Sequence, residues 1–189
     1  QPIQSGSDRA FDFMARHGIS GVIGGGSAEG GAVDRHMQGF QAAYARRGIK
    51  LELGERIAIG FQFHIAESKE AAIRKAAAYY EENMKMFGEL RLVRAITDEQ
   101  IAAMRNPALV PNTKLPRIED AVKAGGFLVG TPADIIEELK KVEKRYPAME
   151  RVICTMPLGT PLATTLEQLD RFAKEVMPAF KAPVRAAAD

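Results

Sequence analysis

Strands and helices alternate along this chain, and that order constrains the fold more than any other feature of the sequence. The segment ERIAIGFQFHIAES is predicted to be a strand, because large apolar residues occupy every second position and so share one face; they are Ile57, Ile59, Phe61, Phe63 and Ile65. Ser68 can then cap a long alanine-rich helix that we expect to continue to about Met86. A repeated order of strand then helix is typical of βα units around a parallel sheet.

Three further strands are expected, each with a helix after it. Residues 2–4 form a short strand that enters the loop SGSD and a helix, GISGVIGGG forms a second strand, and ERVICTMPLG forms the last one. Thr131 and Pro132 begin the helix before that last strand, and the pattern from Thr165 to Gln168 predicts a capping box for the helix after it.

Four strand–helix units are half of a (β/α)8 barrel, which usually has about 250 residues. The sequence therefore predicts an α/β fold of TIM-barrel type, in which residues 1–189 supply about the last four βα units. We expect the other half to lie in a longer chain or in another chain, because an isolated half-barrel would leave two open strand edges.

Residues 87–126 interrupt the alternation. Thr97 and Gln100 are spaced as a capping box for a short helix, whereas the segment RNPALVPNTKLPR carries three prolines that we expect to prevent regular structure. We predict an irregular insertion, whose proline-rich segment from about Leu109 to Pro116 can act as a lid.

Composition argues against several kinds of partner. The 26 basic and 24 acidic residues are interleaved and give a net charge of +2, so we expect neither a nucleic-acid partner nor a membrane surface. Cys154 is the chain's one cysteine and lacks nearby metal ligands, so we expect a buried apolar side chain, no metal and a reducing compartment. No apolar segment reaches the roughly 18 residues of a membrane span, which makes a cytoplasmic protein the expectation.

The loop QSGSDRA has the composition of a phosphate-binding loop. Small residues that lead straight into a helix direct backbone N–H groups and the positive end of the helix towards one point. Gly6 allows the backbone to approach a ligand closely and Ser7 offers a hydroxyl group, while Ser5 and Arg9 can add a hydrogen bond and a charge. The alternative is that Ser7 or Asp8 only caps the helix.

Glycines and a histidine supply the other candidates. Gly24 and Gly25, at the end of the second strand, can leave room for a planar ligand, although the segment can equally be a flexible loop. His64 lies on the smaller, more polar face of its strand, which we expect to point into the barrel near the catalytic mouth. There it can bind a ligand or act as an acid or base, unless a neighbouring backbone group satisfies it. His17 and His36 are expected to be solvated.

Three segments carry a family resemblance, and they occur in the expected order. QSGSDRAFDFMARHGISGVI, FLVGTPADIIEELKK and TLEQLDRFAKEVMPAFK together resemble the C-terminal half of the bacterial luciferase-like flavin-dependent monooxygenase family. The resemblance implies that a barrel binds reduced FMN, or in one branch a deazaflavin coenzyme, and uses oxygen to oxidise a small organic substrate. It also implies that Gly6 and Ser7 contact the flavin phosphate and that Gly24 and Gly25 lie beside the ring. Ala10 departs from relatives that have a threonine at that position.

Other functions fit the same residues. A deazaflavin-dependent oxidoreductase would transfer hydride without oxygen, and a non-catalytic flavin-binding half-barrel would dimerise to hide its sheet edges. An unrelated barrel would use the same loop for a sugar phosphate. The resemblance further implies a separate flavin reductase as partner, and we expect a homo-oligomer whose remaining catalytic residues lie outside this sequence.

Overall fold

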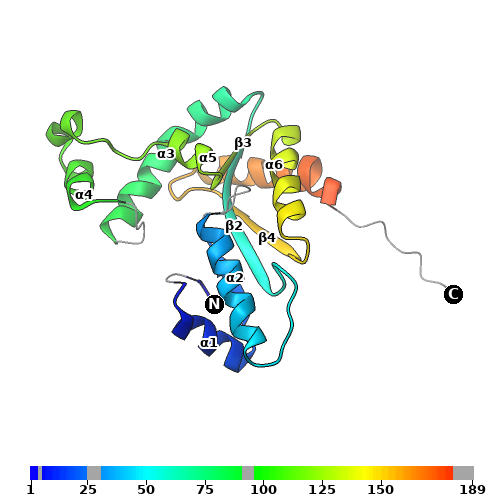
Figure 1. The fold of residues 1–189 in the computed structure, drawn as a ribbon. Coiled ribbons are helices and arrows are strands. Elements are labelled where there is room, and N and C mark those ends of the chain that lie inside the picture. Colours follow the sequence, from blue (N-terminus) through cyan, green and yellow to red (C-terminus); the bar gives the residue numbers. More distant parts are fainter. Residues whose placement is uncertain (4–5, 25–30, 91–95, 181–189) are drawn as a thin grey trace.

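A parallel four-stranded sheet forms the centre of the molecule (Figure 1). The structure is a computed structural model and describes residues 1–3, 6–24, 31–90 and 96–180. The strands are β1 (Gly21–Ile23), β2 (Ile57–Ile65), β3 (Phe127–Gly130) and β4 (Arg151–Thr155). β2 is the longest strand and pairs with the other three. The α/β class with a parallel sheet is therefore confirmed.

Helices separate the strands along the chain. They are α1 (Asp8–His17), α2 (Ala32–Ala45), α3 (Lys69–Glu89), α4 (Asp98–Arg105), a 3-10 helix (Pro107–Asn112), α5 (Ile118–Lys123), α6 (Pro132–Arg145), α7 (Leu162–Arg171), a π-helical turn (Phe172–Val176) and a second 3-10 helix (Met177–Phe180). Three begin at the caps predicted from sequence: Ser68 caps α3, Thr97 and Gln100 form a capping box at α4, and Thr131 and Asp134 form one at α6.

The register shows how the strands are ordered in space. Ala58 of β2 is aligned with both Val22 of β1 and Arg151 of β4, and Gln62 is aligned with both β3 and β4. Because a strand has two edges, β4 occupies one edge of β2, while β1 and β3 lie end to end along the other. Ile3 N donates a hydrogen bond to Val22 O at 2.8 Å, so the residues before the first loop continue the sheet beyond β1. Three of the four strands predicted from sequence are present as β1, β2 and β4, which are neighbours in chain order. The predicted strand at residues 2–4 appears as an isolated bridge from Pro2 to Val22, and Gln4 lies outside the described residues. β3 was not predicted.

The two faces of the sheet are covered differently. The apolar face of β2 predicted from sequence is buried in the main core, against side chains of α1, α2 and α6. A second apolar cluster joins α3 and α5 to Phe127 and Val129 of β3, which are in register with Gln62 and His64 and therefore share their face. Helices consequently lie over both faces near the end of β2. Further along the second face, Ile153 of β4 is 39% exposed.

Two sequence predictions are wrong in detail. The prolines of residues 105–117 do not prevent regular structure, since Pro107 begins a 3-10 helix at a position where no backbone N–H is needed. α7 begins at Leu162, so the segment from Thr165 to Gln168 lies within the helix and is not a capping box. The Gln168 side chain instead bonds to the backbone of Ile65.

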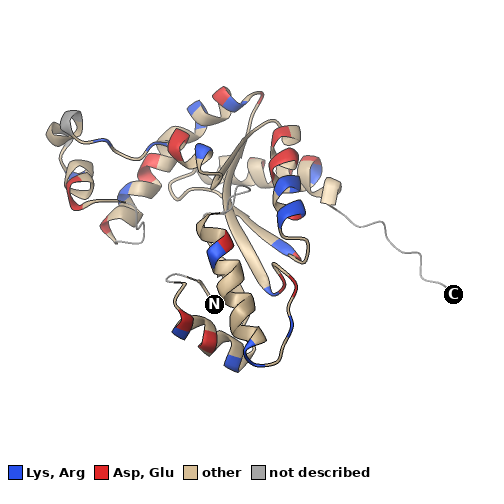
Figure 2. Cartoon of the chain, in the orientation of Figure 1, with Lys and Arg blue, Asp and Glu red and all other residues tan. Residues whose placement is uncertain are grey.

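Charged residues of both signs are interspersed along the helices (Figure 2). On α6, for example, Lys141 forms ion pairs with Glu137 and Glu138 within the same helix. Among the described residues, no helix combines the length and the apolar character needed to cross a membrane.

Candidate functional site

The loop before α1 joins a strand end to a helix start. Ser7 has an extended backbone and caps the helix, since its Oγ accepts a hydrogen bond from Ala10 N at 3.4 Å. The capping role considered in the sequence analysis is therefore present. It does not exclude a ligand, because a serine oxygen that accepts one hydrogen bond can also donate one, and the first N–H groups of a helix have no acceptor within that helix.

Gly6 is required at its position for two reasons. Its φ angle of 58° lies in the left-handed region that side chains disfavour. A Cβ atom there would stand 2.5 Å from Cδ2 and 2.6 Å from Nε2 of His36, which no real Cβ contact tolerates. The imidazole of His36 thus lies directly against the loop.

His36 is the site residue that the sequence analysis missed. It lies on the first turns of α2, is half-buried, and makes an edge contact with the Phe11 ring at 6.4 Å between centroids. The expectation that it is solvated is wrong, whereas His17 is exposed as expected. A signal was available: residues 2–3 and β1 are neighbouring parallel strands, so the segments after their carboxyl ends meet at one edge of the sheet.

Gly24 and Arg9 are the other residues predicted to bind the cofactor that the structure describes. Gly24 is exposed at the end of β1, and a Cβ there would meet no atom of the described residues within 4 Å. Arg9 is exposed and lines a surface depression along α1 with Asp12, Phe13 and Arg16. Ser5 and Gly25 lie outside the described residues. The structure thus brings Gly6, Ser7 and His36 together.

A polar cluster holds the start of α2 in place. Asp34 Oδ1 accepts hydrogen bonds from the Tyr146 hydroxyl at 2.7 Å and from Arg145 Nε at 3.0 Å, and the second carboxylate oxygen pairs with the same guanidinium. The hydrogen bond from Arg145 lowers the pKa of Asp34 to about 2. Burial, and then the bond to Asp34, raises the pKa of Tyr146 to about 12. Since His36 follows Asp34 by two residues, the cluster fixes the turn that carries His36.

His64 is buried between α3 and α7, with 3% of its surface exposed. It lines an open cavity of about 420 Å³ with Lys75 and Tyr79 of α3 and Glu167 and Arg171 of α7. Burial is the largest cause that lowers its pKa, followed by the charge of Lys75, while Glu167 acts in the opposite direction. Its role in binding or catalysis stays a prediction.

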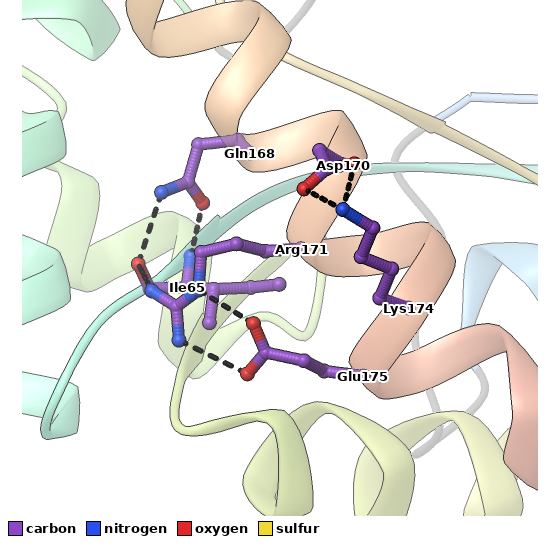
Figure 3. Close-up of polar contacts among 6 residues, drawn as sticks. All are labelled: Ile65, Gln168, Asp170, Arg171, Lys174 and Glu175. Carbon is purple, nitrogen blue, oxygen red and sulfur yellow. Dashed lines mark hydrogen bonds and ion pairs between the residues drawn. The ribbon is translucent and has the colours of Figure 1, made fainter.

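The end of β2 is held by side chains of α7 (Figure 3). The backbone N–H of Ile65 donates to Gln168 Oε1 at 2.6 Å, and Gln168 Nε2 donates to Ile65 O at 3.1 Å. Arg171 Nη1 donates to the same carbonyl at 3.1 Å. The Gln168 side chain is buried, with 2% of its surface exposed. Beyond the last residue of β4, its amide forms the backbone hydrogen bonds that a neighbouring strand would otherwise supply.

Cys154 and a cavity beside α3 lie outside the Gly6 loop and the cavity of His64. Cys154 has its thiol pKa raised to about 12 by burial, which agrees with the prediction of an apolar role. A cavity of about 580 Å³ lies where α3 faces α4 and the segment after it, and its lining includes Met84, Lys85 and Met104.

The structure defines an α/β protein with a parallel sheet and a glycine–serine loop at the amino end of α1. The sequence model of the luciferase-like monooxygenase family matches residues 2–148, and the chain belongs to that family. The resemblance seen in the sequence is therefore confirmed. No curated protein sequence matches the chain.

Solved structures share the fold at low sequence identity. The oxygenating constituent of 3,6-diketocamphane monooxygenase from the CAM plasmid of Pseudomonas putida, in complex with FMN, is 17% identical with a TM-score of 0.58, over 93% of this chain and 46% of that one. A monooxygenase from Streptomyces bottropensis is 15% identical, with a TM-score of 0.56 and coverage of 94% and 47%. EDTA monooxygenase from Chelativorans sp. BNC1 is 18% identical, with a TM-score of 0.53 and coverage of 94% and 42%. The chain thus spans about half the length of these structures.

Proposed function

We propose that this chain is the cofactor-phosphate half of a luciferase-like flavin-dependent monooxygenase, which uses reduced FMN and oxygen to oxidise a small organic substrate. The observation that carries the proposal is the Gly6 loop, where a left-handed glycine, the Ser7 cap and the His36 ring meet at the start of α1. Residues 1–189 are then the C-terminal half of a barrel, with residues 87–126 as its insertion.

The loop suits a phosphate group in its chemistry. A phosphate oxygen can accept hydrogen bonds from the first N–H groups of α1 and from the Ser7 hydroxyl, and the positive end of the helix favours its charge. Gly6 lets the His36 ring approach the loop, and His36 can contribute a ring nitrogen as a further donor. When bound, reduced FMN supplies the oxygen chemistry. The residues of this chain bind and orient the cofactor, and Gly24, which carries no side chain, leaves room for a flat ring.

The test compares ligands that differ at the phosphate. The purified protein is titrated with FMN and with riboflavin, and binding is followed by the change in flavin fluorescence. We expect FMN to bind at least about tenfold more tightly than riboflavin, since charge-assisted hydrogen bonds to the phosphate are lost in riboflavin. Equal affinities for the two ligands would contradict the proposal.

Further arms of the experiment separate the alternatives. Preference for a deazaflavin coenzyme over FMN indicates a hydride-transferring oxidoreductase. Flavin binding without oxygen consumption, when substrate and reduced flavin are supplied, indicates a non-catalytic half-barrel. Binding of sugar phosphates but not of flavins indicates an unrelated use of the loop. A separate flavin reductase belongs to the same proposal by resemblance to the family. A homo-oligomer and a cytoplasmic location are part of the proposal as well.

A further inference from the structure

The cavity at the end of β2 is a second place where the chain gathers polar groups around open space. Its volume of about 420 Å³ lies within the usual range for small-molecule sites. Its lining comes from β2, α3 and α7, and it shares no residue with the Gly6 loop. Ligand binding in this cavity therefore does not require flavin binding at the Gly6 loop.

His64 has a ring nitrogen in this cavity that no described residue satisfies. Only 3% of its surface is exposed, and its Nδ1 atom is buried with no hydrogen-bond partner in the described part of the chain. A buried polar atom left unpaired is destabilising, and such atoms are uncommon in native proteins. A ligand that bonds to Nδ1 would remove that destabilisation.

Charges around His64 favour an anion over a neutral ligand. Lys75 and Arg171 contribute two positive charges to the lining, and Glu167 contributes one negative charge. Lys75 pairs with Glu67 at 2.9 Å, but both side chains are more than half exposed, so the pair is weak and Lys75 can exchange partners at little cost. Arg171 is held by Glu175 and by the carbonyl of Ile65.

We propose that this cavity binds the carboxylate of a small organic acid, which accepts a hydrogen bond from His64 and pairs with Lys75. Arg171 adds a longer-range attraction from the opposite helix, and Glu167 weakens binding by repulsion. The Tyr79 ring offers an apolar surface to the rest of the ligand.

The experiment follows the histidine rings by nuclear magnetic resonance, with benzoate as the anionic probe and benzamide as its neutral counterpart. The sequence contains three histidines, so each ring is assigned by a single His→Gln variant. We expect benzoate to shift the His64 signals saturably and to raise the His64 pKa, while the exposed His17 stays unchanged. Benzamide should leave the His64 signals in place.

Two variants that change charge in opposite directions test the assignment of the cavity. Lys75→Met should weaken benzoate binding about tenfold, and Glu167→Gln should strengthen it. Lys85→Met is the matched control, because Lys85 lies on the same helix and forms a comparable exposed ion pair with Glu82. The Lys85→Met variant should bind benzoate as tightly as the wild type does. The proposal is overturned if benzoate gives no saturable shift of His64, if benzamide binds equally well, or if Lys75→Met and Lys85→Met behave alike.

Discussion

At the scale of single residues, two glycines with similar positive φ angles allow the candidate phosphate site to be tested. Gly6 and Gly18 both have positive φ angles, 58° and 66°, but only Gly6 would bring a Cβ against His36. Gly6→Ala should lower FMN affinity by at least about tenfold, because the loop or the His36 ring must move. Flavin fluorescence titration measures the change.

Gly18→Ala is the control for strain alone. The new methyl group meets no atom of the described residues within 4 Å, so the expected cost comes from the left-handed backbone, about 1 kcal/mol of unfolding free energy. FMN affinity should be unchanged in this variant. Equal losses of affinity in both variants would show that general destabilisation, and not the loop, governs binding.

At the scale of secondary-structure elements, the Asp34 cluster ties α2 to the end of α6 and makes stability depend on pH. The pKa of Asp34 is about 2 in the folded chain, below its ordinary value of 3.8. The stabilisation is therefore complete above about pH 5 and is lost as the pH falls towards 2. It amounts to at most about 2 kcal/mol, and to less where solvent screens the pair. Urea unfolding measured between these pH values should show that the unfolding free energy falls more steeply with decreasing pH in the wild type than in Asp34→Asn.

A second carboxylate serves as the comparison. Asp12 pairs with Arg46 at 2.7 Å, but both side chains are about half exposed. Asp12→Asn should leave the pH dependence of unfolding close to that of the wild type, since exposed pairs contribute little. If Asp12→Asn weakened the pH dependence of the unfolding free energy and Asp34→Asn did not, Asp12 and not Asp34 would be its source.

Gln168 links α7 to β2 through two backbone hydrogen bonds, which gives a second prediction at this scale. Gln168→Met keeps the length of the side chain but leaves the Ile65 N–H and C=O groups without their amide partner. The unfolding free energy should fall by about 2–3 kcal/mol, and the Ile65 amide should exchange its hydrogen faster. Gln38→Met, at an exposed position of α2, should change neither quantity.

At the scale of the whole molecule, two apolar clusters share one sheet. Phe63 of β2 packs in the main core with its ring 4.8 Å from that of Phe172, and Phe127 of β3 packs in the second cluster against Tyr80. Phe63→Ala and Phe127→Ala should each lower the unfolding free energy by about 3–5 kcal/mol. Because β2 and β3 are paired, both variants should keep one cooperative transition by near- and far-ultraviolet circular dichroism. Two separate transitions would mean that the clusters fold independently.

The sequence predicted those parts of the fold that local patterns encode. The alternation of apolar residues predicted strand β2. The caps at Ser68, Thr97 and Thr131 predicted where α3, α4 and α6 begin. β3 was missed because all four of its residues are buried, so its short segment shows no alternation.

The candidate site was only partly predictable for a different reason. Gly6 and Ser7 form a local motif, whereas His36 reaches the loop through the pairing of residues 2–3 with β1. Gln168 and Ile65 are 103 residues apart, and the local pattern at Gln168 predicted a helix cap instead. Contacts of this kind depend on tertiary packing, which a local pattern does not contain.

The Gln168 amide also affects how copies of this chain can meet. An open strand end offers its peptide groups to any extended segment, and pairing of that kind leads to aggregation. At Ile65 both the donor and the acceptor are already bonded to a side chain of the same molecule. An incoming peptide would first have to displace that amide, so this part of the sheet is protected from pairing between molecules.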